Sequence, residues 1–176
     1  MLKLNKKYIT LIPVLIFLGL IAMVVVPLVR GDDPTSIKSV LIDKPVPEFT
    51  RPEFSSTDLK GRVTLVNFFA SWCPPCEAEN DTLLKLKADR GIVIYGINYK
   101  DNSGSRRDYL TRLGNPYAAV TPDPNGTLAI LWGTYGVPET FVIDAQGRIR
   151  YRHSAPLTPK DVDEILIPLM REIQQQ

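Results

Sequence analysis

Histidine, cysteine and methionine are scarce in this sequence of 176 residues, which contains one, two and three of them. Two cysteines exclude a disulfide-rich scaffold and cannot complete a four-cysteine zinc or iron–sulfur site within one chain. The only histidine, His153, has no second histidine to share a metal, so we predict no metal site and give His153 no role. The cysteines lie three positions apart, and a bridge across so short a loop constrains the unfolded chain little. Reactivity therefore explains the pair better than structural cross-linking.

The sequence also lacks an excess of basic residues outside its N-terminus. Four of the 21 Lys and Arg residues and none of the 19 Asp and Glu residues lie in 1–30, which leaves 31–176 with 17 basic and 19 acidic residues. Nucleic-acid binding normally needs a basic surface, so nucleic acid is not an expected partner. Hydrophobic residues make up 44% of the chain, enough for a packed core. The length allows one domain and an appendage.

Charged residues are absent from 9–29, a run long enough to cross a hydrocarbon core of ~30 Å. We predict a transmembrane anchor here. A cleaved signal peptide is the alternative, but its apolar region is typically shorter and is followed by small residues at a cleavage site. The lysines before the run place residues 1–8 in the cytoplasm by the positive-inside rule and the rest of the chain across the membrane. Residues 30–45 are interpreted as a linker, and 46–176 as a periplasmic domain.

The domain has the alternating pattern of an α/β fold. Residues 63–69 are almost all β-branched, aromatic or aliphatic, which is typical of a strand buried on both faces. A helix at 74–89 and a second buried strand at 92–98 complete a predicted right-handed βαβ unit. Further predicted elements are a helix at 105–113, a short strand at 118–121, a short helix at 127–132, an antiparallel hairpin of 140–143 and 148–153, and a helix at 158–173. Pro168 predicts a kink or an earlier end in the last helix.

The strongest chemical signal is the motif Trp72-Cys73-Pro74-Pro75-Cys76, where the first buried strand turns into a helix. A thiol at a helix N-terminus ionises readily, so Cys73 is the predicted attacking thiolate. Cys76 lies one turn further on and can resolve a mixed disulfide by attacking the sulfur of Cys73. Haem attachment is excluded because glutamate, not histidine, follows Cys76. The motif therefore predicts thiol–disulfide exchange.

Pro138 directly precedes a predicted strand, about sixty residues beyond the cysteines. A cis X–Pro bond can leave neighbouring backbone groups free to pair with an extended substrate. Taken alone, this proline indicates only a turn. Together with the cysteine motif, it predicts that substrates dock at Val137 and Pro138.

These motifs together resemble thioredoxin, and several segments resemble the CcmG/DsbE family in particular: 72–79, 96–101, 113–117, 135–144 and 149–153. The resemblance implies a thioredoxin fold, a central mixed sheet flanked by helices, behind an N-terminal transmembrane helix. It implies a thiol:disulfide reductase of the bacterial inner membrane, with its soluble domain in the periplasm. That reductase keeps the Cys-x-x-Cys-His cysteines of apocytochrome c reduced for haem ligation, directly or through a CcmH-like protein. Electrons come from a DsbD- or CcdA-like membrane protein, and the Cys73–Cys76 disulfide is the only redox group.

Two acidic residues, Glu79 and Glu139, match acidic positions of the family. Thioredoxin has a buried aspartate six positions before its first cysteine, where this sequence has Asn67, which cannot titrate. A carboxylate near Cys76 would raise the pKa of that thiol or relay its proton. We expect Glu79 and Glu139 to tune the dithiol and to form an acidic rim of the substrate groove. The alternative is that they are solvated surface residues.

Aromatic residues near the motif have two interpretations. Trp72 is expected to shield the sulfurs and to offer a partner an apolar contact. Tyr99, Tyr117 and Tyr135 could line a groove, although aromatic residues in such segments are more often part of the core. Three other functions remain open: a general disulfide oxidase or isomerase, a TlpA- or ResA-like reductase of another pathway, and a non-enzymatic adaptor with a dormant cysteine pair.

Overall fold

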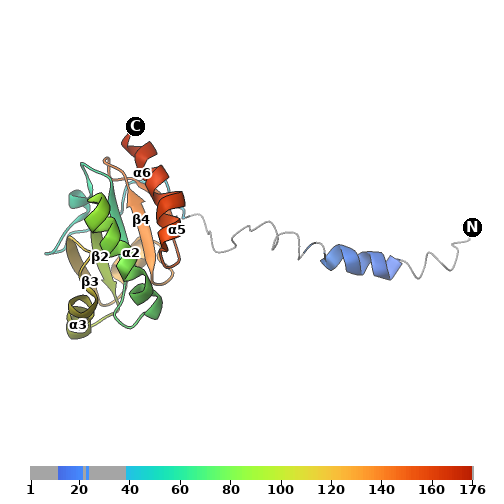
Figure 1. Cartoon of the computed structure of the whole chain (residues 1–176), viewed down its shortest axis with the longest axis horizontal. Coiled ribbons are helices and arrows are strands. Elements are labelled where there is room, and N and C mark those ends of the chain that lie inside the picture. Colours follow the sequence, from blue (N-terminus) through green and yellow to red (C-terminus); the bar gives the residue numbers. More distant parts are fainter. Residues whose placement is uncertain (1–11, 22, 24–38, 176) are drawn as a thin grey trace, which may run out of the picture. The chain divides into compact units, whose positions relative to one another are not determined.

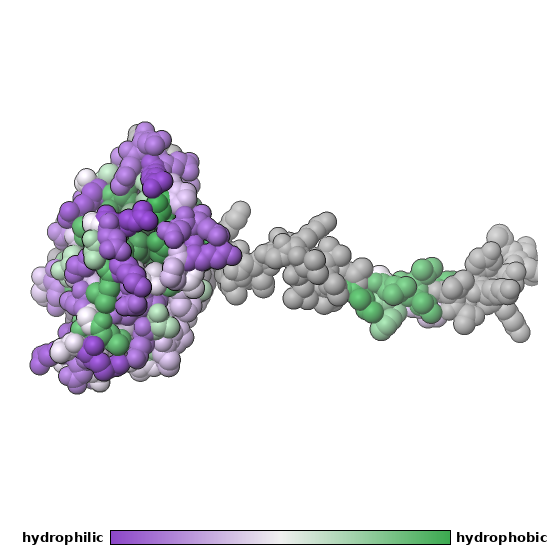
Figure 2. Space-filling model, viewed as in Figure 1, coloured by the Kyte–Doolittle hydropathy of each residue, from purple (hydrophilic) through white to green (hydrophobic). Residues whose placement is uncertain are grey.

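The computed structural model describes residues 12–21, 23 and 39–175, which fall into two units, 1–37 and 38–176. In the first unit, residues 12–21 and 23 are helical, and their visible surface is almost entirely hydrophobic (Figure 2). Within the described part of the chain, no helix has the length and hydropathy needed to cross a membrane. The predicted span at 9–29 also includes residues that lie outside the described part, so the anchor stays a prediction.

The second unit is built on a five-stranded mixed sheet with the strand order β3-β2-β1-β4-β5. The central strand β1 (Thr64–Phe69) pairs in parallel with β2 (Val93–Tyr99), and β2 pairs in parallel with β3 (Ala119–Asp123). On its other side, β1 pairs antiparallel with β4 (Glu139–Ile143), which pairs antiparallel with β5 (Ile149–His153). The predicted hairpin and the parallel pairing around the first helix are confirmed.

Helices cover both faces of this sheet. Figure 1 shows α2 and α6 lying across the same face. The helical elements, in chain order, are the 3₁₀ helix η1 (Ser56–Leu59), α2 (Pro74–Arg90), α3 (Ser103–Leu113), α4 (Thr127–Leu131), α5 (Pro159–Asp161), the π-helical turn η2 (Val162–Leu166) and α6 (Ile167–Gln174). This layered arrangement of helices on a mixed sheet is the thioredoxin-like fold.

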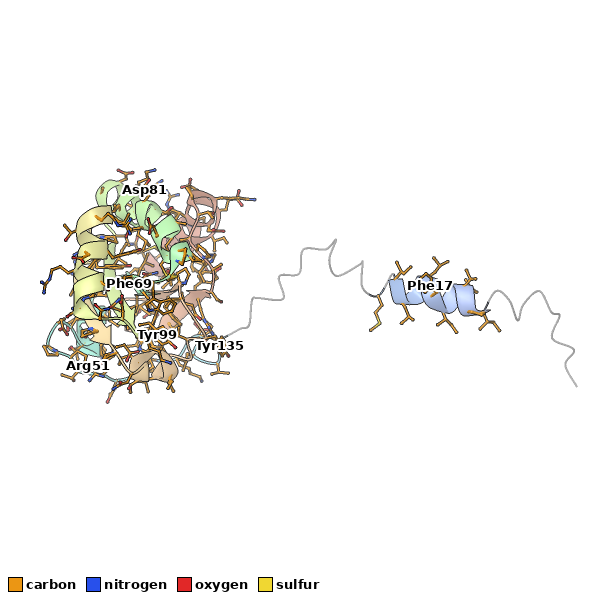
Figure 3. The ribbon with its side chains drawn as sticks, turned by 90° about the horizontal axis from the view of Figure 1, so that it is seen from below. Phe17, Arg51, Phe69, Asp81, Tyr99 and Tyr135 are labelled. Atoms are coloured by element: carbon orange, nitrogen blue, oxygen red, sulfur yellow. A yellow bond between two sulfur atoms is a disulfide. The ribbon has the colours of Figure 1, made fainter. Side chains whose placement is uncertain are left out.

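The core consists of two clusters, one on each face of the sheet. Leu65 and Phe69 of β1 belong to the cluster formed with α2 and the C-terminal helices, whereas Val66 and Phe68 pack with Trp132 on the opposite face. Phe69 lies in the middle of the domain in Figure 3. Every residue of β1 is buried, because successive side chains point to opposite faces and both faces are covered. This explains the continuous apolar run in the sequence.

Two features differ from the expected boundaries. The interruption expected at Pro168 takes the form of the π-helical turn at η2, and the helix resumes through α6 instead of ending early. Proline has no N–H to donate to the preceding turn, which favours such local rearrangement. The domain also starts before Val46: Asp43 N–H donates to the carbonyl of Ile149, at 2.7 Å. Residues 43–46 thus lie along β5 and cover part of that edge of the sheet.

Candidate active site

The two cysteines lie at the N-terminus of α2, directly after the loop that follows β1. Cys73 is the N-cap residue of the helix and is joined to Cys76 by a disulfide bond. The backbone N–H of Cys76 donates to the sulfur of Cys73 at 3.2 Å. Pro74 has no N–H, which costs nothing in the first helical turn. When the disulfide is reduced, the same N–H and the positive end of the helix favour a thiolate at Cys73.

Both cysteine residues are buried. Cys73 is 4% exposed and Cys76 is 1% exposed, so Cys73 is the slightly more accessible residue of the two. The carbonyl oxygen of Val137 lies 3.5 Å from the sulfur of Cys73, and the Val137–Pro138 peptide bond is cis. The fold therefore brings the cysteine motif together with the predicted docking residues, 64 positions away.

The aromatic side chains around the motif differ in exposure. Trp72 is 55% exposed, so its side chain is accessible to a partner. Tyr135 is 72% exposed, whereas Tyr117 is 4% exposed and belongs to the core. Tyr99 is half-buried and packs on the opposite face of the sheet. The core interpretation is therefore correct for Tyr117 and wrong for Tyr135.

Behind the cysteines, Glu79 is buried in a hydrogen-bonded network. One of its carboxylate oxygens accepts from the side-chain amide of Asn67 at 2.8 Å, and the other accepts from the backbone N–H of Leu157 at 2.8 Å. The amide oxygen of Asn67 accepts from the hydroxyl of Tyr117 at 2.7 Å. The amide nitrogen of Asn67 also donates to the hydroxyl of Thr140 at 3.0 Å. Asn67 is thus fixed in one orientation.

Burial controls the protonation of Glu79. Desolvation raises the pKa of its carboxyl to about 7, against the opposing effect of the hydrogen bonds from Leu157 and Asn67. Burial, and secondly the charge of Glu79, raises the pKa of Tyr117 well above its ordinary value, so this hydroxyl remains a neutral donor. Glu79 lies one helical turn after Cys76. The site therefore holds a carboxyl that can take up or release a proton near neutral pH.

The second glutamate, Glu139, is paired with an arginine. Its carboxylate accepts two hydrogen bonds from the guanidinium of Arg152, at 2.8 and 2.9 Å, and both side chains are 3% exposed. Glu139 also accepts from the backbone N–H groups of Tyr135 and Gly136. The guanidinium of Arg152 lies 4.6 Å from the ring centre of Tyr135. Glu139 therefore fixes the loop that leads into Pro138.

Comparison with known proteins agrees with this geometry. The family model described as Redoxin matches residues 42–166. The chain is 41% identical over 182 residues to the thiol:disulfide interchange protein DsbE of Escherichia coli K12, which covers 97% of this chain and 98% of that protein. It is 40% identical over 178 residues to DsbE of Vibrio cholerae, with 96% of each chain covered. A thioredoxin-family thiol:disulfide interchange protein from Chlorobium tepidum superposes with a TM-score of 0.59 and 31% identity, over 72% of this chain and 95% of that one.

The chain belongs to the CcmG/DsbE family. It is a thiol–disulfide oxidoreductase, and Cys73 and Cys76 form its redox-active pair. In the described ranges, no group of three or more His, Cys, Asp or Glu side chains is arranged to hold a metal ion.

The acidic rim predicted for this CcmG/DsbE site is wrong. Glu79 is 1% exposed and Glu139 is 2% exposed, so neither carboxylate lines a surface groove. Burial also excludes the alternative of solvated surface glutamates. The charge of Glu139 is balanced by Arg152, which the sequence analysis does not identify. A partial signal exists: Glu139 directly precedes the first strand of the predicted hairpin, and Arg152 lies in the second strand with the opposite charge.

Two further residues beside the CcmG/DsbE motif are not found by sequence reasoning. The hydroxyl of Tyr109 donates to the carbonyl of Cys76 at 2.9 Å, which ties α3 to the first turn of α2. Asp101 accepts hydrogen bonds from the backbone and side chain of Ser71, two residues before Cys73. Both contacts join segments about thirty residues apart, and no local pattern indicates them.

Proposed function

We propose that this chain is a periplasmic reductant of cytochrome c biogenesis. The observation that carries the proposal is the Cys73–Cys76 disulfide at a helix N-terminus, beside the cis-proline loop and in front of the buried Glu79. The substrate is the oxidised Cys-x-x-Cys-His segment of apocytochrome c, or a CcmH-like protein that carries the electrons onward. A DsbD- or CcdA-like membrane protein returns the chain to its dithiol form.

The proposed reaction proceeds in two exchanges. The thiolate of Cys73 attacks one sulfur of the partner disulfide and forms a mixed disulfide, while the other partner sulfur leaves as a thiolate. Cys76 then loses its proton and attacks the sulfur of Cys73, which releases the partner as a dithiol. Two electrons pass to the partner, and Cys73 and Cys76 end as a disulfide. Glu79 is the group proposed to accept the proton of Cys76, and Trp72, Val137 and Pro138 form the docking surface.

The direction of electron flow is tested by the reduction potential of the Cys73–Cys76 couple. A reductant recharged through the membrane is expected to have a potential near the ~−270 mV of thioredoxin. The potential is measured by equilibrating a fragment that begins at Asp32 against dithiothreitol or glutathione buffers. A value near the ~−120 mV of DsbA would make the chain an oxidant and overturn the cytochrome assignment.

The location is a separate part of the proposal. The uncharged run at 9–29 is proposed to anchor the chain in the inner membrane, with the domain in the periplasm. In a bacterial host, the full chain is expected to remain in the membrane pellet after an alkaline wash, and its domain to be digested by protease added to spheroplasts. Release of a shortened chain into the periplasmic fraction would instead indicate a cleaved signal peptide.

A further inference from the structure

Asp101 is the centre of a group of hydrogen bonds in the loop after β2. One of its carboxylate oxygens accepts from the backbone N–H of Ser71 at 2.7 Å and from the amide of Asn98 at 2.9 Å. The other accepts from the hydroxyl of Ser71 and the backbone N–H of Asn102, both at 2.8 Å. Desolvation opposes ionisation, but these donors outweigh it and lower the pKa of Asp101. Two of the four bonds go to Ser71, which directly precedes Trp72.

Lys100, the residue before Asp101, accepts a hydrogen bond from Trp72. The indole N–H of Trp72 donates to the backbone carbonyl of Lys100 at 3.1 Å. Lys100 has a φ of 45°, a left-handed conformation that residues other than glycine rarely adopt. Its own N–H donates to the carbonyl of Asp123 at 2.9 Å, so the turn is also tied to the end of β3. The exposed indole therefore has a fixed hydrogen-bond partner on a well-anchored turn.

Trp72 also forms one wall of an open hollow, whose lining includes Ser71 and Trp72 but neither cysteine. The hollow has a volume of about 630 Å³ and lies between the active-site loop and α3, where Asp108 and Arg112 line it. Tyr109 belongs to the same lining and contacts the carbonyl of Cys76. Trp72 directly precedes Cys73, so a polypeptide whose cysteine bonds to Cys73 comes close to this wall.

We propose that Asp101 is a positioning residue for partner recognition: with the carbonyl of Lys100, it holds Ser71 and Trp72 so that the indole forms a fixed wall for a protein disulfide. This proposal rests on the proposed exchange with a polypeptide partner. It goes beyond that function because it assigns selectivity for protein disulfides to Asp101, a residue that touches neither the cysteines nor the partner. A rigid aromatic wall loses little conformational entropy on binding, which favours a protein partner over a small disulfide.

The test is an Asp101→Asn substitution in the full chain, kept in solution with a mild detergent because of its apolar N-terminal run. Asparagine keeps the shape of the side chain but replaces one acceptor oxygen with a donor, so it cannot satisfy all four donors. Ser71→Ala is a second, milder variant that removes only the hydroxyl bond. Asp89→Asn is the matched control, because Asp89 is an exposed carboxylate at the far end of α2.

Two measurements are made on each reduced protein. Time-resolved tryptophan anisotropy reports the freedom of Trp72, since Trp132, the only other tryptophan, is fully buried. Exchange rates are compared for an oxidised Cys-x-x-Cys-His peptide and for oxidised glutathione. Asp101→Asn is expected to add a fast anisotropy decay and to lower the ratio of the peptide rate to the glutathione rate about tenfold, chiefly through KM. Ser71→Ala is expected to change both readouts less, and Asp89→Asn neither.

A double-mutant cycle with Trp72→Ala separates positioning from a general structural effect. If Asp101 acts through the indole, Asp101→Asn causes no further loss of peptide selectivity in a chain that already carries Trp72→Ala. Additive losses, an unchanged peptide ratio, or an equal slowing of both disulfides would each overturn the proposal. Failure of the proposed function is distinguishable, because the unsubstituted chain would then reduce neither disulfide, whatever the anisotropy of Trp72.

Discussion

A Cys73→Ser variant is expected to lose disulfide reduction by at least about a thousandfold, the scale on which removal of a nucleophile slows covalent catalysis. A Cys76→Ser variant is expected to fail differently. Its Cys73 can still attack, but nothing resolves the product, so a mixed disulfide with the partner accumulates. The reason is positional: Cys73 is the N-cap residue with the larger exposure, whereas Cys76 is deeper in the helix.

The measurement is turnover of an oxidised Cys-x-x-Cys-His peptide, followed by mass spectrometry of the products under non-reducing conditions. Cys76→Ser should yield a species heavier than the chain by one peptide, which dithiothreitol removes. Cys73→Ser should yield none. If Cys73→Ser retained its biological role in cytochrome c assembly, the chain would be an adaptor with a dormant cysteine pair. If Cys73→Ser formed the trapped species and Cys76→Ser did not, the roles of the two cysteines would be reversed.

Substituting Glu79 with glutamine is expected to abolish a large part of the pH dependence of stability. Burial raises the pKa of Glu79 from its ordinary 4.5 to about 7, so the folded protein keeps this proton in a range where the unfolded chain has released it. The neutral carboxyl stabilises the fold fully below pH 4.5, the pKa of this group in the unfolded chain. This stabilisation is lost as the pH rises through about 7, the pKa in the folded protein. The corresponding loss is ~3 kcal/mol.

Denaturant unfolding of the oxidised fragment from Asp32 at about pH 5 and about pH 8 checks this expectation. The disulfide removes any contribution from the cysteines, and a His153→Gln background removes the imidazole. Glu79→Gln should reduce the difference in unfolding free energy between the two pH values by roughly 2.5 kcal/mol relative to its parent, because at about pH 5 the unfolded carboxyl is already partly ionised. An unchanged difference would mean that Glu79 is ionised throughout the range. The same variant in its reduced form should also lose the step near neutral pH in the rate of peptide reduction.

The hydrogen bond between Asn67 and Glu79 offers a matched control for that result. Asn67→Asp alone places two carboxyls at hydrogen-bond distance in a buried site, where they share one proton. Asn67→Asp combined with Glu79→Gln exchanges the amide and the carboxyl across the same hydrogen bond. If a single buried carboxyl is what the site requires, the combined variant regains the pH dependence that Glu79→Gln loses. If the combined variant does not regain the pH dependence, then the pH dependence requires the carboxyl to lie on α2 as well as to be buried.

Local patterns predict most of the fold because they depend on neighbouring residues. The buried run of β1 and the helix start at Cys73 follow from hydrophobicity and capping, which are short-range properties. The surroundings of the acidic residues depend instead on long-range pairing. Whether Glu139 faces solvent is decided by the hairpin register that brings Arg152 against it, and Asp101 contacts Ser71 only because β1 and β2 are neighbours. The sequence motifs locate Glu139 but not its partner Arg152, and no local pattern indicates the contacts of Asp101.

The burial of Cys73 affects how fast dissolved oxidants convert the Cys73–Cys76 dithiol to the disulfide. Only 4% of this residue is open, so a dissolved small oxidant meets a narrow target, whatever its driving force. A polypeptide that docks beside Val137 is held near the sulfur of Cys73, because the carbonyl oxygen of Val137 lies 3.5 Å from that sulfur, and it does not depend on a chance approach. The rate at which the dithiol is oxidised then depends more on how easily an oxidant reaches Cys73 than on the reduction potential of that oxidant. For the proposed periplasmic reductant, burial of Cys73 would slow reaction with dissolved oxidants and leave the dithiol available to a docked partner.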